Sequence, residues 1–513
     1  MEFKTPGVYL NEINAFPNSV VEVATAIPAF IGYTQKAAHQ SSSLLNKPWR
    51  ITSFGEFVEH FGAAPKFEFT VTNTAGTLRI QHTGGLCLLH QSMRLFFKNG
   101  GNACYVVSIG TFDEAHIEGF SATKIRAGID TLKREQEPTL LVVPDAVRLD
   151  FASCINVQQH MLVHCGDEMK NRFAILDIHN GYLSRTDAAA DCVTEFRDAL
   201  GTNFLNFGAA YYPWLNTTIM QDDELDYSVF TDSAAQNVVR ALVTEDASGN
   251  KNAEEVKTIV RAIGQSFDDF AAQYQATPEN ATADANSVGL AFRHHIHEVQ
   301  QSLMRLSPRF GALFNLVKQQ LNLLPPSAAM AGIYTAVDQS RGVWKAPANV
   351  SLNAVVSPAV NLTHEEQEDL NITTAGKSVN AIRSFIGEGT LVWGARTLDG
   401  NSLDWRYINV RRTMIMIEES LRLACKAYIF EPNVANTWVS MKSMVHNFLQ
   451  SIWRSGGLAG SRPDDAFAVH IGLHETMTAD DLQKGLLRIT VLVALTRPAE
   501  FIEITFQQQQ QKS

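Results

Sequence analysis

The chain has 513 residues, of which 45% are hydrophobic and 19% charged, which excludes wholesale disorder and leaves room for two or three domains with cores. A net charge of −11 argues against nucleic acid as the main partner, because phosphate binding needs a basic surface. No apolar run approaches the roughly 18 residues of a membrane span, and no secretion signal is recognisable at the N-terminus. Direct membrane insertion is therefore not expected.

Residues 1–24 are predicted to form an extended N-terminal arm. Val8 and Leu10 alternate with less apolar neighbours, which is the period of two that is typical of a strand. A strand at a free terminus has few local partners, so its backbone amides favour pairing with the edge of a sheet. The region 25–110 mixes short strands and helices and ends in a strand at 103–109.

The region 111–323 alternates apolar strands with amphipathic helices. The strands are short and almost wholly apolar, and they are expected at 139–144, 173–177 and 207–212. This pattern predicts a parallel sheet covered on both faces. Further helices are expected near 253–275, 287–306 and 309–323. The diproline Pro325-Pro326 cannot continue a helix and is interpreted as a domain boundary.

Two long helices, at about 409–428 and 433–453, dominate the last third of the chain. In the first, apolar residues recur every three or four positions and predict a buried stripe, with the charged residues on the opposite, exposed side. Strands are predicted at 485–495 and 501–506, and residues 507–513 form a polar tail.

Fragments that suggest chemistry are incomplete. The segment 376–378, Gly-Lys-Ser, partly matches a phosphate-binding loop, but Asn371 stands where the first glycine of that motif belongs. The cysteines show no paired spacing and most lie among apolar residues, which predicts buried thiols in a reducing compartment: Cys87, Cys104, Cys154, Cys165, Cys192 and Cys425.

One predicted helix carries a cluster of possible metal ligands: His294, His295, His297 and Glu298. The set is incomplete and no second cluster completes it, so a solvated or interfacial group is expected rather than a metal site. No catalytic residues, metal site or cofactor are predicted.

Several stretches carry a family signal. Within them, Trp344-Lys-Ala-Pro and Trp393-Gly-Ala-Arg stand out, and the chain opens with Thr5-Pro-Gly-Val-Tyr-Leu-Asn-Glu12. These stretches closely resemble contractile tail sheath proteins, the family that forms the outer cylinder of contractile phage tails and related injection particles: 5–12, 25–32, 324–349, 382–398 and 405–412. The resemblance covers residues 1–35 and 324–506.

The resemblance implies a multidomain α+β and α/β fold. Its C-terminal sheath domain would combine helices with a mixed sheet that strands from neighbouring subunits complete. The implied domains are an arm at 1–24, the N-terminal part of the sheath core at 25–110, an outward-facing α/β insertion at 111–323, the sheath domain at 324–506 and a flexible tail at 507–513.

The resemblance also implies a function. Subunits would polymerise helically, as stacked six-subunit rings, around an inner tube and then contract to drive that tube through a target envelope. Energy would be stored in a metastable assembly, so neither enzymatic activity nor a nucleotide is needed. The implied partners are further copies of the chain, an inner tube protein, and baseplate and terminal cap proteins. Assembly in the cytoplasm of the producing cell is expected, as part of a phage tail or a released tail-like particle.

Three sets of intersubunit residues follow from the resemblance. The donated N-terminal strand would comprise Val8, Tyr9, Leu10, Asn11, Glu12 and Ile13. The donated C-terminal strand would comprise Phe501, Ile502, Glu503, Ile504, Thr505 and Phe506. Contacts with the inner tube would come from the charged side of helix 409–428, through Arg411, Arg412, Glu418, Glu419 and Lys426.

Alternatives remain for each part of this interpretation. Both terminal strands could pair within their own subunit, as many terminal strands do. The charges on helix 409–428 could be an ordinary solvated face. A static filament would share strand exchange but would not contract. An enzyme in the α/β region would use polar residues at the ends of strands, where Asp145 and Asp177 lie.

Overall fold

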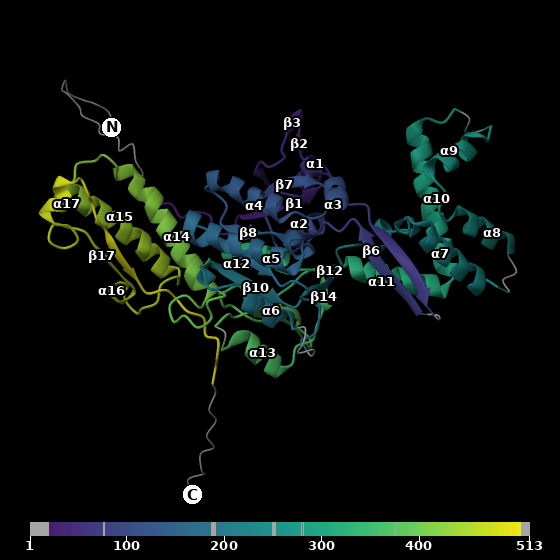
Figure 1. The fold of residues 1–513 in the computed structure, drawn as a ribbon. Coiled ribbons are helices and arrows are strands. Elements are labelled where there is room, and N and C mark those ends of the chain that lie inside the picture. The colour runs from purple at the N-terminus through teal and green to yellow at the C-terminus, as the bar shows by residue number, and fades with distance from the viewer. Residues whose placement is uncertain are drawn as a thin grey trace, which may run out of the picture. The chain divides into compact units, whose positions relative to one another are not determined.

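The computed structural model describes residues 20–74, 77–185, 191–248, 253–278, 280, 282–374 and 376–503. Contacts divide the chain into two compact units (Figure 1). Unit 1 combines residues 1–25, 337–346 and 407–513, and unit 2 combines residues 26–336 and 347–406.

A nine-stranded mixed sheet forms the centre of unit 2, in the order β13-β16-β15-β10-β9-β8-β1-β7-β4. From β7 to β15 the neighbouring strands run parallel, whereas β4, β16 and β13 pair antiparallel. The strands are β1 (Pro28–Thr34), β4 (Trp49–Ile51), β7 (Cys104–Thr111), β8 (Leu140–Val142), β9 (Phe173–Asp177), β10 (Gly208–Tyr212), β13 (Val350–Ser351), β15 (Asn380–Phe385) and β16 (Gly389–Val392). The predicted parallel strands β8, β9 and β10 are confirmed, and every residue in them is buried.

Helices cover both faces of this sheet. On one face lie α2 (Leu89–Lys98) and α12 (Ser327–Arg341), where Phe96 packs against Phe30 and the Tyr334 and Tyr211 hydroxyls lie 2.8 Å apart. On the other face lie α4 (Ala122–Thr131) and α5 (Phe151–Val163). Gly128 of α4 is required there, because an added Cβ would lie 2.6 Å from a methyl of β7.

The predicted domain boundaries at 110/111 and 323/324 do not coincide with the bounds of the two compact units. Strands from all three predicted domains hydrogen-bond side by side in the one sheet. The diproline Pro325-Pro326 is buried inside unit 2 and directly precedes α12. Sheet pairing joins segments irrespective of their separation in the sequence, which a search for breaks along the chain does not detect.

A second core within unit 2 belongs to a helical module. The hairpin β5 (Glu68–Thr74) and β6 (Thr77–Gly84) shares this core with α7 (Ser233–Asp246), α8 (Ala253–Ala262), α10 (Ala285–Leu306) and α11 (Pro308–Leu321) (Figure 1). The helix α9 (Phe267–Gln275) packs on α10, where the ring of Phe270 lies against that of Phe292. The single helix predicted at 253–275 is two helices, because Gly264 has a φ of +80° and Ser266 caps α9.

Shorter elements complete unit 2. Its remaining helices are α1 (Phe54–Phe61), α3 (Phe112–Glu118), α6 (Cys192–Ala199) and α13 (His364–Asn371). Its smaller sheets are β2 (Ala38–His39) with β3 (Ser42–Ser43), and β12 (Leu323–Leu324) with β11 (Leu215–Thr217) and β14 (Val355–Pro358).

Unit 1 is built on two long helices, α14 (Ile408–Cys425) and α15 (Ala435–Arg454), which confirm the predicted pair. They share a core with the two-stranded antiparallel sheet of β17 (Phe467–His470) and β18 (Thr490–Val493). The short helices α16 (Pro463–Ala466) and α17 (Ala479–Gln483) flank β17. Of the strand predicted at 485–495, only residues 490–493 form a strand, which is β18.

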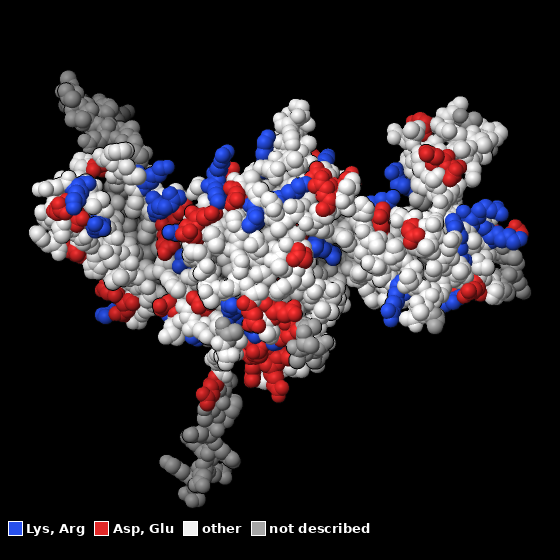
Figure 2. All heavy atoms as spheres, in the orientation of Figure 1, with Lys and Arg blue, Asp and Glu red and all other residues white. Residues whose placement is uncertain are grey.

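The charged side chains on the face shown in Figure 2 are mixed in sign. The densest group of one sign is acidic and lies at α13, whose sequence includes Glu365, Glu366, Glu368 and Asp369. This face thus lacks the continuous basic surface that phosphate binding requires. Among residues of described placement, no helix combines the length and apolar content needed to cross a membrane.

Candidate intersubunit site

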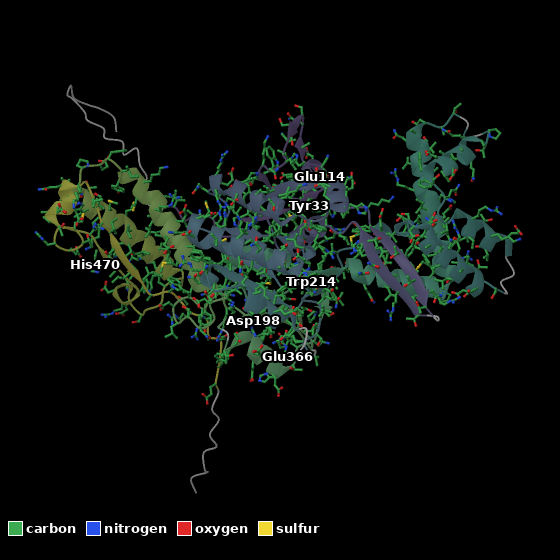
Figure 3. The ribbon with its side chains drawn as sticks, viewed as in Figure 1. Tyr33, Glu114, Asp198, Trp214, Glu366 and His470 are labelled. Atoms are coloured by element: carbon green, nitrogen blue, oxygen red, sulfur yellow. The ribbon has the colours of Figure 1, made fainter. Side chains whose placement is uncertain are left out.

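The sheet of unit 1 offers two open edges. Phe467 pairs with Val493 and His470 with Thr490 (His470 is labelled in Figure 3), and within the described residues the sheet has no third strand. A two-stranded sheet with open edges is the usual acceptor for an added strand. The sequence analysis missed β17, although Phe467 and Val469 alternate with Ala468 and His470 in the expected period of two.

Backbone geometry identifies the groups on the outer edge of β18. The Ala494 N–H donates to the Ala466 carbonyl (2.8 Å), so position 494 faces β17. Because antiparallel pairing alternates along a strand, the N–H and C=O groups of Val491 and Val493 face away from β17. Their side chains pack on the core of unit 1, so a strand added at this edge would extend an apolar inner face.

The predicted N-terminal strand, Val8–Ile13, lies outside the described residues. The root of the arm is described, and it is docked on unit 1. The Val23 N–H donates to the Ser420 hydroxyl of α14 (3.1 Å), and the Thr25 hydroxyl donates to Asp338 (2.6 Å). Val20 and Val23 pack against the core of this unit.

The C-terminal segment is held as far as Glu500 and is exposed beyond it. Asn409 donates to the Thr496 carbonyl (3.0 Å), and the Tyr407 hydroxyl donates to Glu500 (3.0 Å). Phe501 and Ile502 are 71% and 79% exposed and, with Glu503, form no strand. Ile504, Thr505 and Phe506 lie outside the described residues. Pairing of 501–503 within the same subunit, one of the alternatives above, is not observed.

The charged side of α14 differs from the prediction. Arg411 and Arg412 are only 6% and 4% exposed, so the expectation that both lie on an exposed face is wrong. Arg412 makes two bonds to Asp338 of α12 (2.6 and 3.0 Å) and a third to the Thr25 carbonyl (2.9 Å). These partners lie far from α14 in the sequence, so the helical period of α14 alone does not reveal them.

The remaining predicted contact residues are less buried. Glu418 is exposed and receives one bond from Arg411 (3.4 Å), and Lys426 is exposed. The Glu419 carboxylate is mostly buried beneath Arg422, which donates two bonds to it (2.5 and 2.7 Å). The exposed charges of this helix therefore include Glu418 and Arg422, and the exposed Lys426 lies in the turn that directly follows it.

Comparison with known proteins finds similar sequences for part of the chain. Residues 401–509 match the phage tail sheath C-terminal domain. The tail sheath protein of Burkholderia phage BcepMu is 28% identical over 143 residues, which make up 27% of this chain and 30% of that protein. This chain is related to contractile sheath proteins. The matched stretch spans under a third of the length of that curated relative.

The similarity to solved structures covers nearly the whole chain. The chain is similar to the sheath complex of an extracellular contractile injection system, PVC, in its contracted state, with a TM-score of 0.58, 27% identity and 99% of both chains covered. It is also similar to the contracted helical sheath of the anti-feeding prophage, with a TM-score of 0.61, 26% identity, and coverage of 99% of this chain and 100% of that one. Its structural neighbours include baseplate assemblies as well as sheath complexes.

The two carboxylates named for the enzyme alternative are tied to backbone. Asp145 is fully buried and accepts bonds from the N–H groups of Leu88 (2.6 Å) and Tyr33 (3.0 Å; Tyr33 is labelled in Figure 3). Burial raises its pKa to about 6. Asp177 accepts bonds from the N–H of Ser327 (2.8 Å) and from its hydroxyl. Both side chains thus join sheet strands to helix N-termini, and neither faces solvent.

The pKa of Asp177 predicts a pH effect on stability. Burial raises this pKa from 3.8 to about 7, against the two bonds from Ser327 that lower it. Since the folded value exceeds the ordinary one, the stabilising contribution is complete below about pH 4 and is lost as the pH rises through about 7. Asp177→Asn mimics the protonated form. The melting temperature of this variant, relative to that of the wild type, should therefore rise as the pH increases from 4 to 8. A flat difference would mean that Asp177 is already ionised and stabilised by Ser327.

The other predicted fragments also have structural roles. Lys377 is buried, and its ammonium donates to the Arg197 carbonyl rather than facing a phosphate. Burial lowers its pKa. The Ser378 hydroxyl donates to the Asn371 carbonyl (2.7 Å). His294 is exposed and lies 3.5 Å from Glu298, as an isolated pair on α10.

A cluster that the sequence analysis missed joins Asp130, His164 and Glu168, whose ligand-type atoms lie within 4.8 Å of one another. The Lys133 ammonium lies 2.9 Å from Asp130 and 2.8 Å from Glu168, so it pairs with both carboxylates. A guanidinium N–H of Arg172 lies 2.8 Å from His164 Nε2. Since arginine can only donate, this bond places the neutral imidazole proton on Nδ1, which then cannot ligate a metal. The cluster is an ion-pair network.

Proposed function

We propose that this chain is the structural subunit of a contractile sheath. Copies would polymerise helically around an inner tube and contract to drive the tube through a target envelope. The observation that carries the proposal is the two-stranded sheet of unit 1, with open edges in a chain similar over nearly its whole length to sheath subunits. The exposed segment beginning at Phe501 and the docked root of the N-terminal arm supply the matching donors.

Strand addition would link the copies. Val8–Ile13 of one subunit and Phe501–Phe506 of another would pair with the two edges of β17–β18 in a third. Main-chain hydrogen bonds give such a contact its affinity, and alternate side chains give its register. A head-to-tail linkage that does not close produces an open helical polymer. Such links would hold the lattice together while subunits rotate during contraction.

The further partners follow from this role. Stacked six-subunit rings would enclose an inner tube protein, which exposed charges of α14 and of the turn after it, including Glu418 and Lys426, would contact. Glu419 would take part only if Arg422 releases it, and the buried Arg411 and Arg412 would support the helix from within. Baseplate and terminal cap proteins would bound the cylinder, and assembly would take place in the cytoplasm of the producing cell. The helical module α7–α11, within the predicted insertion 111–323, would face outward.

A contractile sheath and a static filament differ in whether the assembled cylinder can shorten. We expect the purified chain to form hollow, striated cylinders under electron microscopy. Mild guanidinium treatment should convert them into shorter, wider cylinders before they dissolve, because the extended lattice is metastable. Cylinders that dissolve at constant length would favour the static filament. Monodisperse particles at every concentration would contradict polymerisation altogether.

A further inference from the structure

The turn that joins α14 to α15 presents an apolar tip. Phe430 is fully exposed and Ile429 is 59% exposed. Phe430 also has a φ of +74°, the left-handed region that is unfavourable for a bulky side chain. The turn is nevertheless closed by a bond from the Glu431 N–H to the Tyr428 carbonyl (3.1 Å). An ordered, strained turn that holds an aromatic ring in water indicates a contact made in an assembly.

A pocket of about 240 Å³ lies along the C-terminal half of α15. Its lining combines the apolar side chains of Val20, Trp344, Met444, Phe448 and Ile452 with the polar side chains of Glu22, Asn447, Ser451 and Ser455. The volume is below that of pockets that bind drug-sized ligands and suits a single side chain.

We propose that Phe430 of one copy inserts into this pocket of the next copy. The tip and the pocket belong to the same unit: the tip precedes the N-terminus of α15 and the pocket lies along its C-terminal half, in a helix whose 20 residues span about 30 Å. A copy therefore cannot fill its own pocket. The contact joins two different surfaces, so it is heterologous and adds copies head to tail, as a polymer requires.

The pocket adjoins the proposed strand linkage. Val20 and Glu22 line it and belong to the docked root of the N-terminal arm. Movement of the arm during strand exchange would therefore reshape the pocket, which couples the two contacts. This inference rests on the proposed function for its polymer, but the pairing of tip with pocket is a separate claim.

Truncating the tip should raise the threshold concentration for assembly. A phenylalanine ring buries about 150–250 Å², and central aromatic residues dominate interface energetics. We expect Phe430→Ala to raise the threshold for cylinder formation roughly 30-fold and Phe430→Asp to raise it further. The melting temperature of the subunit should stay unchanged, because the ring has no packing within the subunit to lose. Ile386→Ala, at a fully exposed position of unit 2, is the matched control and should leave the threshold unchanged.

Cross-linking tests the pairing directly. One chain would carry Phe430→Cys and a second, of different tag length, Ser451→Cys in the pocket lining. A short bis-maleimide should join the two chains only when both are present, because a heterologous contact needs one partner of each kind. The native Cys425, which is half-buried, sets the background in the wild-type lane. A mixture of Ile386→Cys with Ser451→Cys should give no product above that background.

The outcomes separate this inference from the proposed function. Cylinders that form without a mixed Phe430–Ser451 product overturn the inference and leave the sheath intact. A product from Phe430→Cys alone also overturns it, since it would mean a symmetric contact of two tips. If Phe430→Asp assembles normally but fails to retain an inner tube, the tip binds the tube instead. If the wild-type chain never polymerises, the proposed function fails, and cross-linking of the concentrated chain still decides the pairing.

Discussion

Deletion of residues 1–15 is expected to abolish assembly while leaving the subunit folded. The deleted segment contains the proposed donor strand Val8–Ile13, whereas the docked root, with the Val23–Ser420 and Thr25–Asp338 bonds, is kept. Without its main-chain link each copy loses a neighbour. We expect no cylinders at about ten times the wild-type threshold concentration, which corresponds to about 1.4 kcal/mol per contact. Electron microscopy and sedimentation measure the assembly, and circular dichroism measures the fold.

A matched pair of C-terminal deletions controls this experiment. Removal of 507–513 takes away only the polar tail and should leave the cylinders unchanged. Removal of 501–513 also takes the proposed C-terminal donor and should prevent assembly. Normal cylinders from the chain without residues 1–15 would show that the linkage does not lie in the arm. A lowered melting temperature in that chain would show that the arm stabilises its own subunit.

Arg412→Ala is expected to destabilise unit 1 by about 3–5 kcal/mol, because it leaves a buried carboxylate without its charge partner. The side chains of Arg412 and Asp338 are only 3% and 4% exposed, and the same guanidinium holds the Thr25 carbonyl at the root of the arm. The loss should appear as faster hydrogen exchange in α14, measured by mass spectrometry. Hydrogen exchange also reports on unit 1 and unit 2 separately, whereas a single unfolding transition would not distinguish them.

Two variants make this result specific. Arg412→Met combined with Asp338→Leu removes both charges and should recover much of the lost stability, since a buried ion pair can be replaced by apolar packing. Arg422→Ala removes an arginine of the same helix that is 54% exposed, and it should cost under about 1 kcal/mol. Equal effects of Arg412→Ala and Arg422→Ala would contradict the assigned role of the buried pair.

Local pattern was sufficient for much of the fold. The apolar runs at β8, β9 and β10 predict buried parallel strands, because strands covered on both faces need apolar side chains at every position. The recurrence of apolar residues every three or four positions predicts α14 and α15, because only a helix places such residues on one side. The family resemblance rests on short motifs, and these too are local.

The candidate site was only partly predictable. The acceptor strand β17 has four residues, too few for a period of two to stand out from its surroundings. The charged side of α14 was predicted as exposed because helical period shows which residues share a face but not what covers that face. Residues 20–25 and 337–346 cover Arg412, and they are brought to α14 by the fold of unit 1.

The sequence by itself determined most of the long helices and buried strands, the family resemblance and the absence of a complete catalytic motif, since each depends on residue types at short spacing. The tertiary structure alone decided which segments share a sheet, which charges are buried, and that an exposed aromatic tip precedes α15 while a pocket lies along the C-terminal half of that helix. These features depend on contacts between residues tens to hundreds of positions apart. Such contacts are fixed by the packing of the whole unit, and no local pattern encodes them.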